Sequence, residues 1–283
     1  VFQMFALYPH MNVGKNMLYP LLSQGMSKSD AQKRVREVAK ILGIEAMLNK
    51  SVSGLSGGDR QRVALGRAIV REPKAFLMDE PLGALDAEFR EHMSEELRAL
   101  HDRMGATTVY VTHDQLEAMQ MGDKIVVMNH GVVEQFGKPQ DIYDKPATMF
   151  VADFIGSPPM SFLYFEGAVL ANTNTVVLSG ETIAVPVQRE SAQGKLVFGV
   201  RPEHVTLSDQ SKFKGEILAT EYLGTSQILT IKTLNGELKA RISSAQRVDI
   251  GDRVGLSFNE KTITLFNAAS GAAIRSDLNE GSV

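Results

Sequence analysis

The sequence has 283 residues, of which 43% are hydrophobic and 22% charged, as expected for a globular protein with one large or two medium domains. Its 30 basic and 33 acidic residues give a net charge of −3, so no global field would recruit nucleic acid or an anionic membrane. Without cysteine, the chain can form neither a disulfide nor a thiolate metal site. No apolar run approaches the ~20 residues that cross a bilayer and no signal-type N-terminus is present, so we expect a soluble protein.

The chain opens on an apolar stretch, Val1 to His10, which predicts the end of a buried strand running into a loop, and we expect further chain to precede it. An amphipathic helix is predicted from Asp30 to Gly43, where glycine ends it. Its apolar face consists of Ala31, Val35, Val38, Ala39 and Leu42.

A Leu-Ser-Gly-Gly sequence, Leu55 to Gly58, precedes a predicted helix from Asp59 to Arg71. Ser56, Gly57 and Gly58 offer a hydroxyl and unobstructed N–H groups at a helix N-terminus, where the helix dipole favours an anion such as phosphate. The same residues could simply cap the helix. Asp59 lies in the first turn, where a carboxylate is favoured.

An apolar strand, Phe76 to Asp79, is predicted to be buried and parallel, and it ends in two adjacent carboxylates before Pro81. Such a strand can deliver one acid, Asp79, to a magnesium ion and the next, Glu80, to a water molecule. Acidic residues after strands are common, so a plain cap remains the alternative.

The next helix is predicted from Asp86 to Gly105, with Asp86 as its N-cap. Thr107 to Thr112 is apolar and β-branched, which predicts a strand, and His113 follows at the strand end where open α/β sheets bind ligands. His113 could reach a phosphate or be structural.

Lys124–Met128 and Val132–Phe136 predict a hairpin, followed by short helices near 139–143 and 148–155. Turn-forming residues at Gly156 to Pro159 predict a domain boundary, giving domains 1–155 and 156–283. The second domain alternates apolar and polar residues and has a hairpin signal at Asn235-Gly236, which predicts a small all-β barrel. From Ser161 onward it has 12 basic and 13 acidic residues, so nucleic-acid binding is disfavoured.

These motifs together resemble the ATP-binding-cassette (ABC) family of ATPases. The matching segments are Val1-Phe2-Gln3 (Q-loop), LSGGDRQ from Leu55 (signature, with Asp59 in place of the usual Gln), FLMDEP from Phe76 (Walker B), Leu82–Asp86 (D-loop), VYVTHDQLEAM from Val109 (H-loop), and Phe198–His204, which resembles the regulatory TOBE-type domain of carbohydrate-import ATPases. The resemblance implies an α/β fold: part of a P-loop NTPase cassette with a helical subdomain, then a small OB-like barrel. Arg201 and Glu203 of the last segment could equally form a local salt bridge.

The resemblance also implies a role for each site residue. Asp79 and Gln3 would bind Mg²⁺; Glu80, His113 and Gln3 would be catalytic; and Ser56, Gly57, Gly58 and Asp86 would contact ATP. Two cassettes would associate head to tail, each ATP lying between the P-loop of one subunit and the signature of the other.

The implied function is that of the ATP-binding subunit of an ABC importer, coupling ATP hydrolysis to uptake of a sugar or a glycerol-phosphate-like solute. Its partners would be a second ATPase subunit, two membrane permease subunits and, indirectly, a periplasmic or extracellular solute-binding protein, which places it at the cytoplasmic face of the membrane. Ala6 to His10 would lie against a permease coupling helix, although Tyr8 could equally belong to the core.

Two other readings stay open: a soluble ABC protein of translation or DNA repair, and a non-catalytic fragment. The second has a specific basis, because the sequence contains no G-x-x-x-x-G-K-[ST] motif, and Gly14-Lys15-Asn16 lacks the upstream glycine and the hydroxyl. We therefore expect that a segment carrying the P-loop is missing and that this chain alone is inactive. We also expect the strand edge left exposed to favour association.

Overall fold

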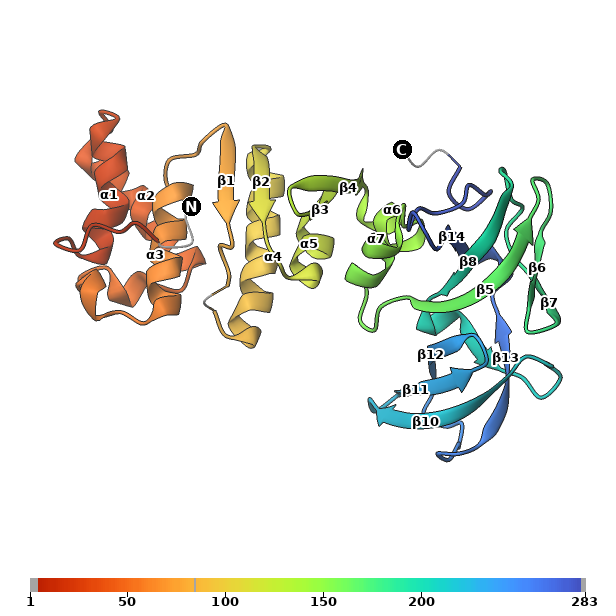
Figure 1. The fold of residues 1–283 in the computed structure, drawn as a ribbon. Coiled ribbons are helices and arrows are strands. Elements are labelled where there is room, and N and C mark those ends of the chain that lie inside the picture. Colours follow the sequence, from red (N-terminus) through yellow and green to blue (C-terminus); the bar gives the residue numbers. More distant parts are fainter. Residues whose placement is uncertain (1–4, 84, 281–283) are drawn as a thin grey trace. The chain divides into compact units, whose positions relative to one another are not determined.

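The computed structural model describes residues 5–83 and 85–280, and it divides the chain into two compact units, 1–122 and 123–283 (Figure 1). Gln3 lies outside the described residues. The elements of the first unit are α1 (Val13–Ser23), α2 (Lys28–Ile41), η1 (Glu45–Met47), η2 (Val52–Gly54), α3 (Gly57–Ile69), β1 (Ala75–Asp79), α4 (Ala87–Met104), β2 (Thr107–Val111) and α5 (Gln115–Met121).

Three helices, α1 to α3, pack on one another and share an apolar core with β1 and α4. The predicted helices around 30–43 and 59–71 are confirmed as α2 and α3, each capped by a serine side chain that accepts from a backbone N–H. In α3, Gly66 permits close packing, because a Cβ there would lie 2.8 Å from Met17 Cε and 2.9 Å from Leu42 Cδ1.

Strands β1 and β2 pair in parallel, from Ala75 opposite Thr107 to Asp79 opposite Val111, which confirms both predicted strands. The prediction that the first of them is buried was wrong for one of its faces. Phe76 and Met78 are buried, whereas Leu77 is 70% exposed and Val109 and Val111 of β2 are more than half exposed. The described residues therefore cover this two-stranded sheet on one side.

Helix α4 begins and ends as its sequence predicts. Asp86 is the N-cap and accepts from the Phe89 N–H at 2.9 Å, and Gly105 ends the helix in the left-handed region with φ of 60°. Because Asp86 and Glu80 lie at opposite ends of the short Pro81–Leu85 connection, the cap fixes where that connection enters the helix.

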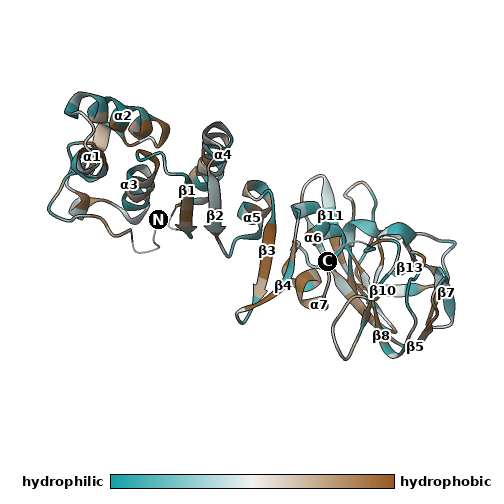
Figure 2. Ribbon diagram, turned by 90° about the horizontal axis from the view of Figure 1, so that it is seen from above, coloured by the Kyte–Doolittle hydropathy of each residue, from teal (hydrophilic) through white to brown (hydrophobic). Residues whose placement is uncertain are grey.

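The second unit combines a hairpin and two short helices with an antiparallel β region. Its elements are β3 (Ile125–Asn129), β4 (Val132–Gly137), α6 (Pro139–Asp144), α7 (Met149–Phe154), β5 (Ser161–Val169), β6 (Thr175–Leu178), β7 (Glu181–Ala184), β8 (Ala192–Val200), η3 (Pro202–His204), β9 (Val205–Leu207), β10 (Lys214–Tyr222), β11 (Ser226–Thr233), β12 (Gly236–Ser243), β13 (Arg253–Phe258), η4 (Glu260–Thr262) and β14 (Thr264–Asn267). The predicted hairpin is β3–β4, and Figure 2 shows its first strand among the hydrophobic segments.

The β region consists of a five-stranded sheet in the order β12-β11-β10-β13-β9, a three-stranded sheet β14-β8-β5 and the hairpin β6-β7. Side chains from the two larger sheets fill one core, including Leu163, Phe198, Leu229 and Leu256. The prediction of a hairpin turn at Asn235-Gly236 was displaced by one residue. Thr233 pairs with Gly236, so Leu234 and Asn235 form the turn.

The segment 123–155 is grouped with the β region, and a buried arginine contributes to the attachment. Arg201, 2% exposed, donates to the carbonyls of Tyr143 (2.8 Å), Ala152 (3.2 Å) and Ile155, and its guanidinium lies 4.1 Å from the centre of the Tyr143 ring. Glu203, the expected salt-bridge partner, accepts from the Tyr143 hydroxyl instead. The contact-based division thus falls before Asp123, and the domain boundary at Gly156 stays a prediction.

No helix in the described ranges 5–83 and 85–280 is long and apolar enough to cross a membrane.

Candidate nucleotide site

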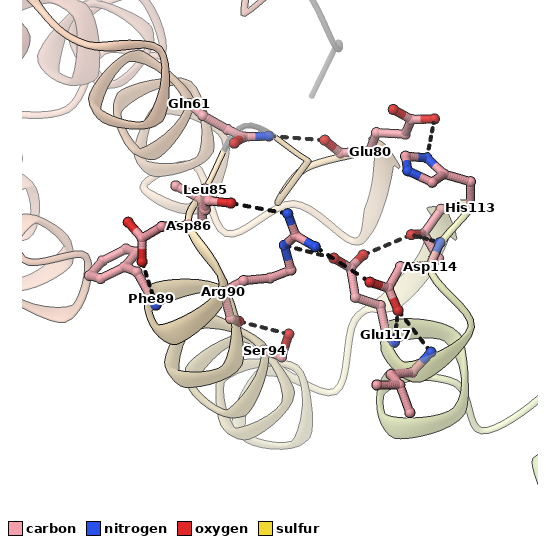
Figure 3. Close-up of polar contacts among 12 residues, drawn as sticks. Gln61, Glu80, Leu85, Asp86, Phe89, Arg90, Ser94, His113, Asp114 and Glu117 are labelled. Carbon is pink, nitrogen blue, oxygen red and sulfur yellow. Dashed lines mark hydrogen bonds and ion pairs between the residues drawn. The ribbon is translucent and has the colours of Figure 1, made fainter. Parts of the chain in front are cut away.

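Glu80 and His113 meet at the carboxyl ends of the two parallel strands (Figure 3). Glu80 follows β1 directly, His113 follows β2 after one residue, and Glu80 Oε1 lies 2.9 Å from His113 Nδ1. The hydrogen bond to Glu80, followed by the attraction of its negative charge, raises the pKa of His113 above its ordinary value of 6.5. Two residues predicted separately from their strand positions therefore form one pair.

The backbone of Glu80 is held in an unusual conformation. Its φ is 44°, in the left-handed region that a non-glycine residue adopts at a cost of about 1 kcal/mol. Its N–H donates to the Val111 carbonyl at 2.8 Å, while its carbonyl accepts from Gln61 Nε2 at 3.0 Å. These bonds fix the direction in which the carboxylate leaves the strand.

Gln61 was not among the predicted site residues. It lies on α3, is 3% exposed, and links the helix that begins at Ser56 to the carbonyl of Glu80. The signal in the sequence was a long polar side chain on the helix face that also carries Ala64 and Leu65, three and four residues further on. A polar group at a core position requires a hydrogen-bond partner.

Ser56 is the N-cap of α3, with its hydroxyl accepting from the Asp59 N–H at 3.1 Å. The side chain of Ser56 is exposed, and a Cβ added to Gly57 would meet no atom within 4 Å, so the start of this helix is open to an anion. Gly58 lies half-buried in the first turn, and Asp59 pairs with Arg62. The capping function that the sequence left open is confirmed, and it does not conflict with phosphate binding.

Asp79 is the last residue of β1 and is exposed, one position before Glu80. Within the part of the chain that the structure describes, no group of three or more His, Cys, Asp or Glu residues could hold a metal ion. Mg²⁺ is commonly bound by one or two carboxylates together with phosphate oxygens and water rather than by a protein cage. A single exposed carboxylate at a strand end therefore fits Mg²⁺ brought in with a nucleotide.

A concave surface lies at the N-terminal end of the described chain. A groove of about 540 Å³ is lined by Phe5, Ala6, Tyr8, Tyr19, Pro20, Ser23, Gln24, Ala64, Arg67, Ala68 and Arg71. Tyr8 and Tyr19 form an edge-to-face pair with ring centres 5.2 Å apart, and both rings are exposed by more than a third. Arg67 of α3 donates to the carbonyls of Ala6 (2.8 Å) and Phe5 (3.3 Å), which positions this segment beside α3.

The fully buried Asn16 of α1 also positions the groove, and sequence analysis did not detect it. Its side chain accepts from the Tyr8 N–H (2.8 Å) and donates to the Tyr8 and Asn12 carbonyls (3.1 Å each). Helix α1 itself was not predicted, and Pro20, an unfavourable residue in a helix interior, lies inside it. The signals were Asn12 as a cap and the spacing of Val13, Met17 and Leu21.

Comparison with known proteins gives a consistent result. The ABC transporter family matches residues 1–83 and the TOBE domain matches residues 198–266. The uncharacterized ABC transporter ATP-binding protein YurJ of Bacillus subtilis is 44% identical over 97% of this chain and 78% of its own length. The trehalose/maltose import ATP-binding protein MalK of Thermococcus litoralis is 43% identical, covering 97% and 77%. The sn-glycerol-3-phosphate import ATP-binding protein UgpC of Salmonella typhi is 44% identical, covering 97% and 78%.

Among solved structures, the dimeric structure of MJ0796, a bacterial ABC transporter cassette, aligns with 49% of this chain and 61% of that one at 36% identity and a TM-score of 0.46.

The parallel strand ends, the capped Leu-Ser-Gly-Gly helix and the β region that follows define an ATP-binding cassette with an appended TOBE domain. The chain belongs to the ATP-binding proteins of ABC transporters. This confirms the fold class and the family expected from the motifs.

Proposed function

We propose that this chain, once completed by a P-loop-bearing segment, is the ATP-binding subunit of an importer that couples ATP hydrolysis to uptake of a sugar or a glycerol-phosphate-like solute. The observation that carries the proposal is the Glu80–His113 pair at 2.9 Å, at the edge of a parallel sheet where such folds bind ligands. The names of the relatives support the solute class, since MalK is described as a trehalose/maltose importer subunit and UgpC as an sn-glycerol-3-phosphate importer subunit.

In the proposed reaction, water attacks the γ-phosphorus of ATP and the bond to the β-phosphate oxygen breaks, releasing ADP and phosphate. The Glu80 carboxylate would orient the water and accept its proton. His113 would donate from Nε2 to a γ-phosphate oxygen, because Nδ1 already faces Glu80. Asp79, together with Gln3, would hold Mg²⁺, which supplies charge compensation when bound.

Ser56, Gly57 and Gly58 would serve the ATP of a partner cassette in a head-to-tail dimer, and Asp86 would lie in the segment that crosses to the same site. The exposure of Ser56 and the open space beside Gly57 support this role, since a phosphate can reach the first N–H groups of α3. The proposed location is the cytoplasmic face of the membrane, held there by two permease subunits and served by a solute-binding protein outside.

The experiment that tests hydrolysis is Glu80→Gln in a chain completed with a P-loop-bearing segment. Glutamine keeps the size and a hydrogen bond to His113 but cannot accept the proton. We expect ATP-driven dimerisation to persist and turnover to be lost, as measured by phosphate release. Turnover at the unmodified rate would remove Glu80 from the proposed role.

The 283 residues alone contain no G-x-x-x-x-G-K-[ST] motif, and we propose that they neither bind nor hydrolyse ATP appreciably. They would at most lend Ser56 and Gly58 to the site of a complete partner cassette. Titration of magnesium-ATP into the purified chain, following heat and phosphate release, tests this. Micromolar binding with steady turnover would contradict it.

The groove beside Tyr8 and Tyr19 is the proposed permease contact. Two exposed aromatic rings and a cationic side chain over one of them, with Arg67 Cζ 5.3 Å from the Tyr8 ring centre, suit an amphipathic helix end. Tyr19→Glu should reduce the permease recovered with the tagged subunit from detergent-solubilised membranes. Tyr164→Glu, a change at an exposed tyrosine of β5, is the control and should leave recovery unchanged.

A further inference from the structure

Arg90 on α4 contacts two loops that are distant in sequence (Figure 3). Its Nη2 donates to the Leu85 carbonyl at 3.0 Å, on the segment that leads into α4. Its Nη1 lies 3.5 Å from Asp114 Oδ2, and its Nε lies 3.8 Å from Glu117 Oε1. One guanidinium therefore faces both the Leu85–Asp86 segment and the residues that follow His113.

Glu117, at the other end of this contact, holds the end of β2. It is 5% exposed and accepts from the hydroxyls of Tyr110 (3.0 Å) and Thr112 (2.8 Å). Thr112 Oγ1 in turn accepts from the Asp114 N–H at 3.0 Å. These bonds bracket His113 on both sides, so a displacement of Glu117 would be transmitted to the His113 backbone.

The charges of Arg90, Asp114 and Glu117 help to hold these side chains in one arrangement. Burial, and then the negative charge of Glu117, raise the pKa of Tyr110, so its hydroxyl remains a donor at ordinary pH. A buried carboxylate is costly unless it is paired and hydrogen-bonded, and Arg90 supplies the positive charge for both Asp114 and Glu117. The planar fork of arginine hydrogen-bonds the Leu85 carbonyl and Asp114, while its Nε faces Glu117 as an ion pair without a hydrogen bond; a lysine ammonium, a single point charge, cannot reproduce this arrangement.

We propose that Arg90 is a positioning residue that couples the Leu85–Asp86 segment to the His113 loop. This deepens, and rests on, the proposed function, in which Asp86 lies near the partner's ATP and His113 near this subunit's own. Events at one ATP would thus bias the γ-phosphate contact at the other through a single side chain. Such a coupling acts equally in both directions.

The test uses the 283-residue chain, isotopically labelled, by nuclear magnetic resonance at one pH without nucleotide. Glu117→Gln perturbs the His113 side, and the Phe89 amide, which Asp86 caps, reports on the other side. We expect this amide resonance to shift in the E117Q protein. The shift should be lost when E117Q is made in the R90Q background. In the reverse direction, Asp86→Ala should shift the His113 ring signals only while Arg90 is present.

Arg98→Gln is the matched control background. Arg98 is also on α4, is equally exposed, and joins α4 to the end of α5 through the Met121 carbonyl at 2.8 Å. Transmission should survive in R98Q. If R90Q does not fold, R90K keeps the charge while losing the fork, and the transmitted shift should be smaller than in the unmodified chain. An equal shift with and without Arg90, or none in the unmodified background, would overturn the proposal.

Because no nucleotide is present, the outcome does not depend on whether this family member hydrolyses ATP, and the Glu80→Gln experiment does not depend on Arg90. Failure of one proposal is therefore distinguishable from failure of the other.

Discussion

Among single residues, the Glu80–His113 pair depends on hydrogen bonding rather than on burial. The His113 side chain is 75% exposed and that of Glu80 26% exposed, so water screens their attraction. The fixed backbone of Glu80 compensates, because Gln61 and Val111 bind its main-chain carbonyl and N–H, so that less of the residue remains to be ordered when its carboxylate meets the ring. His113 can therefore exchange its hydrogen bond to Glu80 for one to a phosphate when a phosphate binds.

The raised pKa of His113 leads to a pH prediction. A histidine whose folded pKa is raised stabilises the fold fully below its unfolded pKa of 6.5 and loses this contribution as the pH rises through the folded value. We expect a His113 titration midpoint above 6.5 by nuclear magnetic resonance, returning toward 6.5 in Glu80→Gln. Glu95→Gln, at an exposed position of α4, should leave the midpoint in place. A midpoint unaffected by E80Q would show that another group raises it.

Arg201 differs from this exposed pair, because its charged guanidinium group and the hydrogen bonds that it donates are almost fully buried. Burial lowers its pKa, and three carbonyls accept its N–H groups. Arg201→Met leaves these carbonyls unsatisfied and should lower the free energy of unfolding of the second unit by about 3 kcal/mol. Arg189→Met, which removes an exposed arginine paired with Asp277, should cost at most about 1 kcal/mol. Urea denaturation of both variants gives the comparison, and similar losses would contradict it.

At the scale of elements, α3 connects three parts of the first unit. Ser56 caps its start, Gln61 binds the Glu80 carbonyl from its middle, and Arg67 binds the Ala6 carbonyl near its end. A rigid helix that contacts all three moves them together. A small displacement of the capped end would therefore also displace Glu80 and the groove beside Tyr8.

The start of α3 allows capping and phosphate binding to be separated. Aspartate caps a helix as well as serine does, so Ser56→Asp should change the free energy of unfolding by less than about 0.5 kcal/mol. The added negative charge should nevertheless weaken ATP-dependent association with a complete cassette by about tenfold or more.

Asn12→Asp is the control for this change. Asn12 caps α1, accepting from the N–H of Lys15 as Ser56 does from that of Asp59, and the change adds the same negative charge at a capped helix start. It should leave both stability and association unchanged. Thermal unfolding and fluorescence binding measure the two effects, and equal weakening by both variants would argue against a phosphate at Ser56.

At the scale of the whole molecule, two compact units meet in sequence at Gly122 and Asp123, whereas composition predicts a boundary at Gly156. Contacts across more than 45 residues of sequence underlie the difference, among them the bonds of Arg201 to the carbonyls of Tyr143, Ala152 and Ile155. Turn-forming residues mark a change in composition and do not reveal which side a preceding helix packs against.

Fragments separate these two boundaries. We expect residues 123–283 to unfold cooperatively and at higher urea than residues 156–283, because the shorter fragment lacks the three carbonyls and the Tyr143 ring that contact Arg201. Residues 1–155, joined to a P-loop-bearing segment, should still fold as a cassette. Equal stability of the two C-terminal fragments would favour the boundary at Gly156.

The sequence predicted α2, α3, α4 and both parallel strands, because each depends on local periodicity and caps. It also placed Glu80 and His113 at the ends of these strands, whereas the pairing that brings the two ends together is known from the structure. It could not predict Gln61, Arg90 or Glu117 as part of the site, since the Gln61–Glu80 and Arg90–Glu117 contacts span 19 and 27 residues and are decided by packing. Nor could it predict the exposed face of β1, because an apolar sequence is compatible with a strand that is covered on one face or on both.

Because of the left-handed backbone at Glu80, selection for thermal stability and selection for activity should favour different residues at this position. Glycine adopts φ of 44° without strain, so Glu80→Gly should raise the melting temperature slightly, by the equivalent of up to about 1 kcal/mol, while deleting the carboxylate beside His113. A library screened for thermostability alone should therefore enrich glycine at this position. A screen that also required transport should retain glutamate. The residue found at position 80 would then show whether a population of variants had been selected for stability alone or for stability and transport.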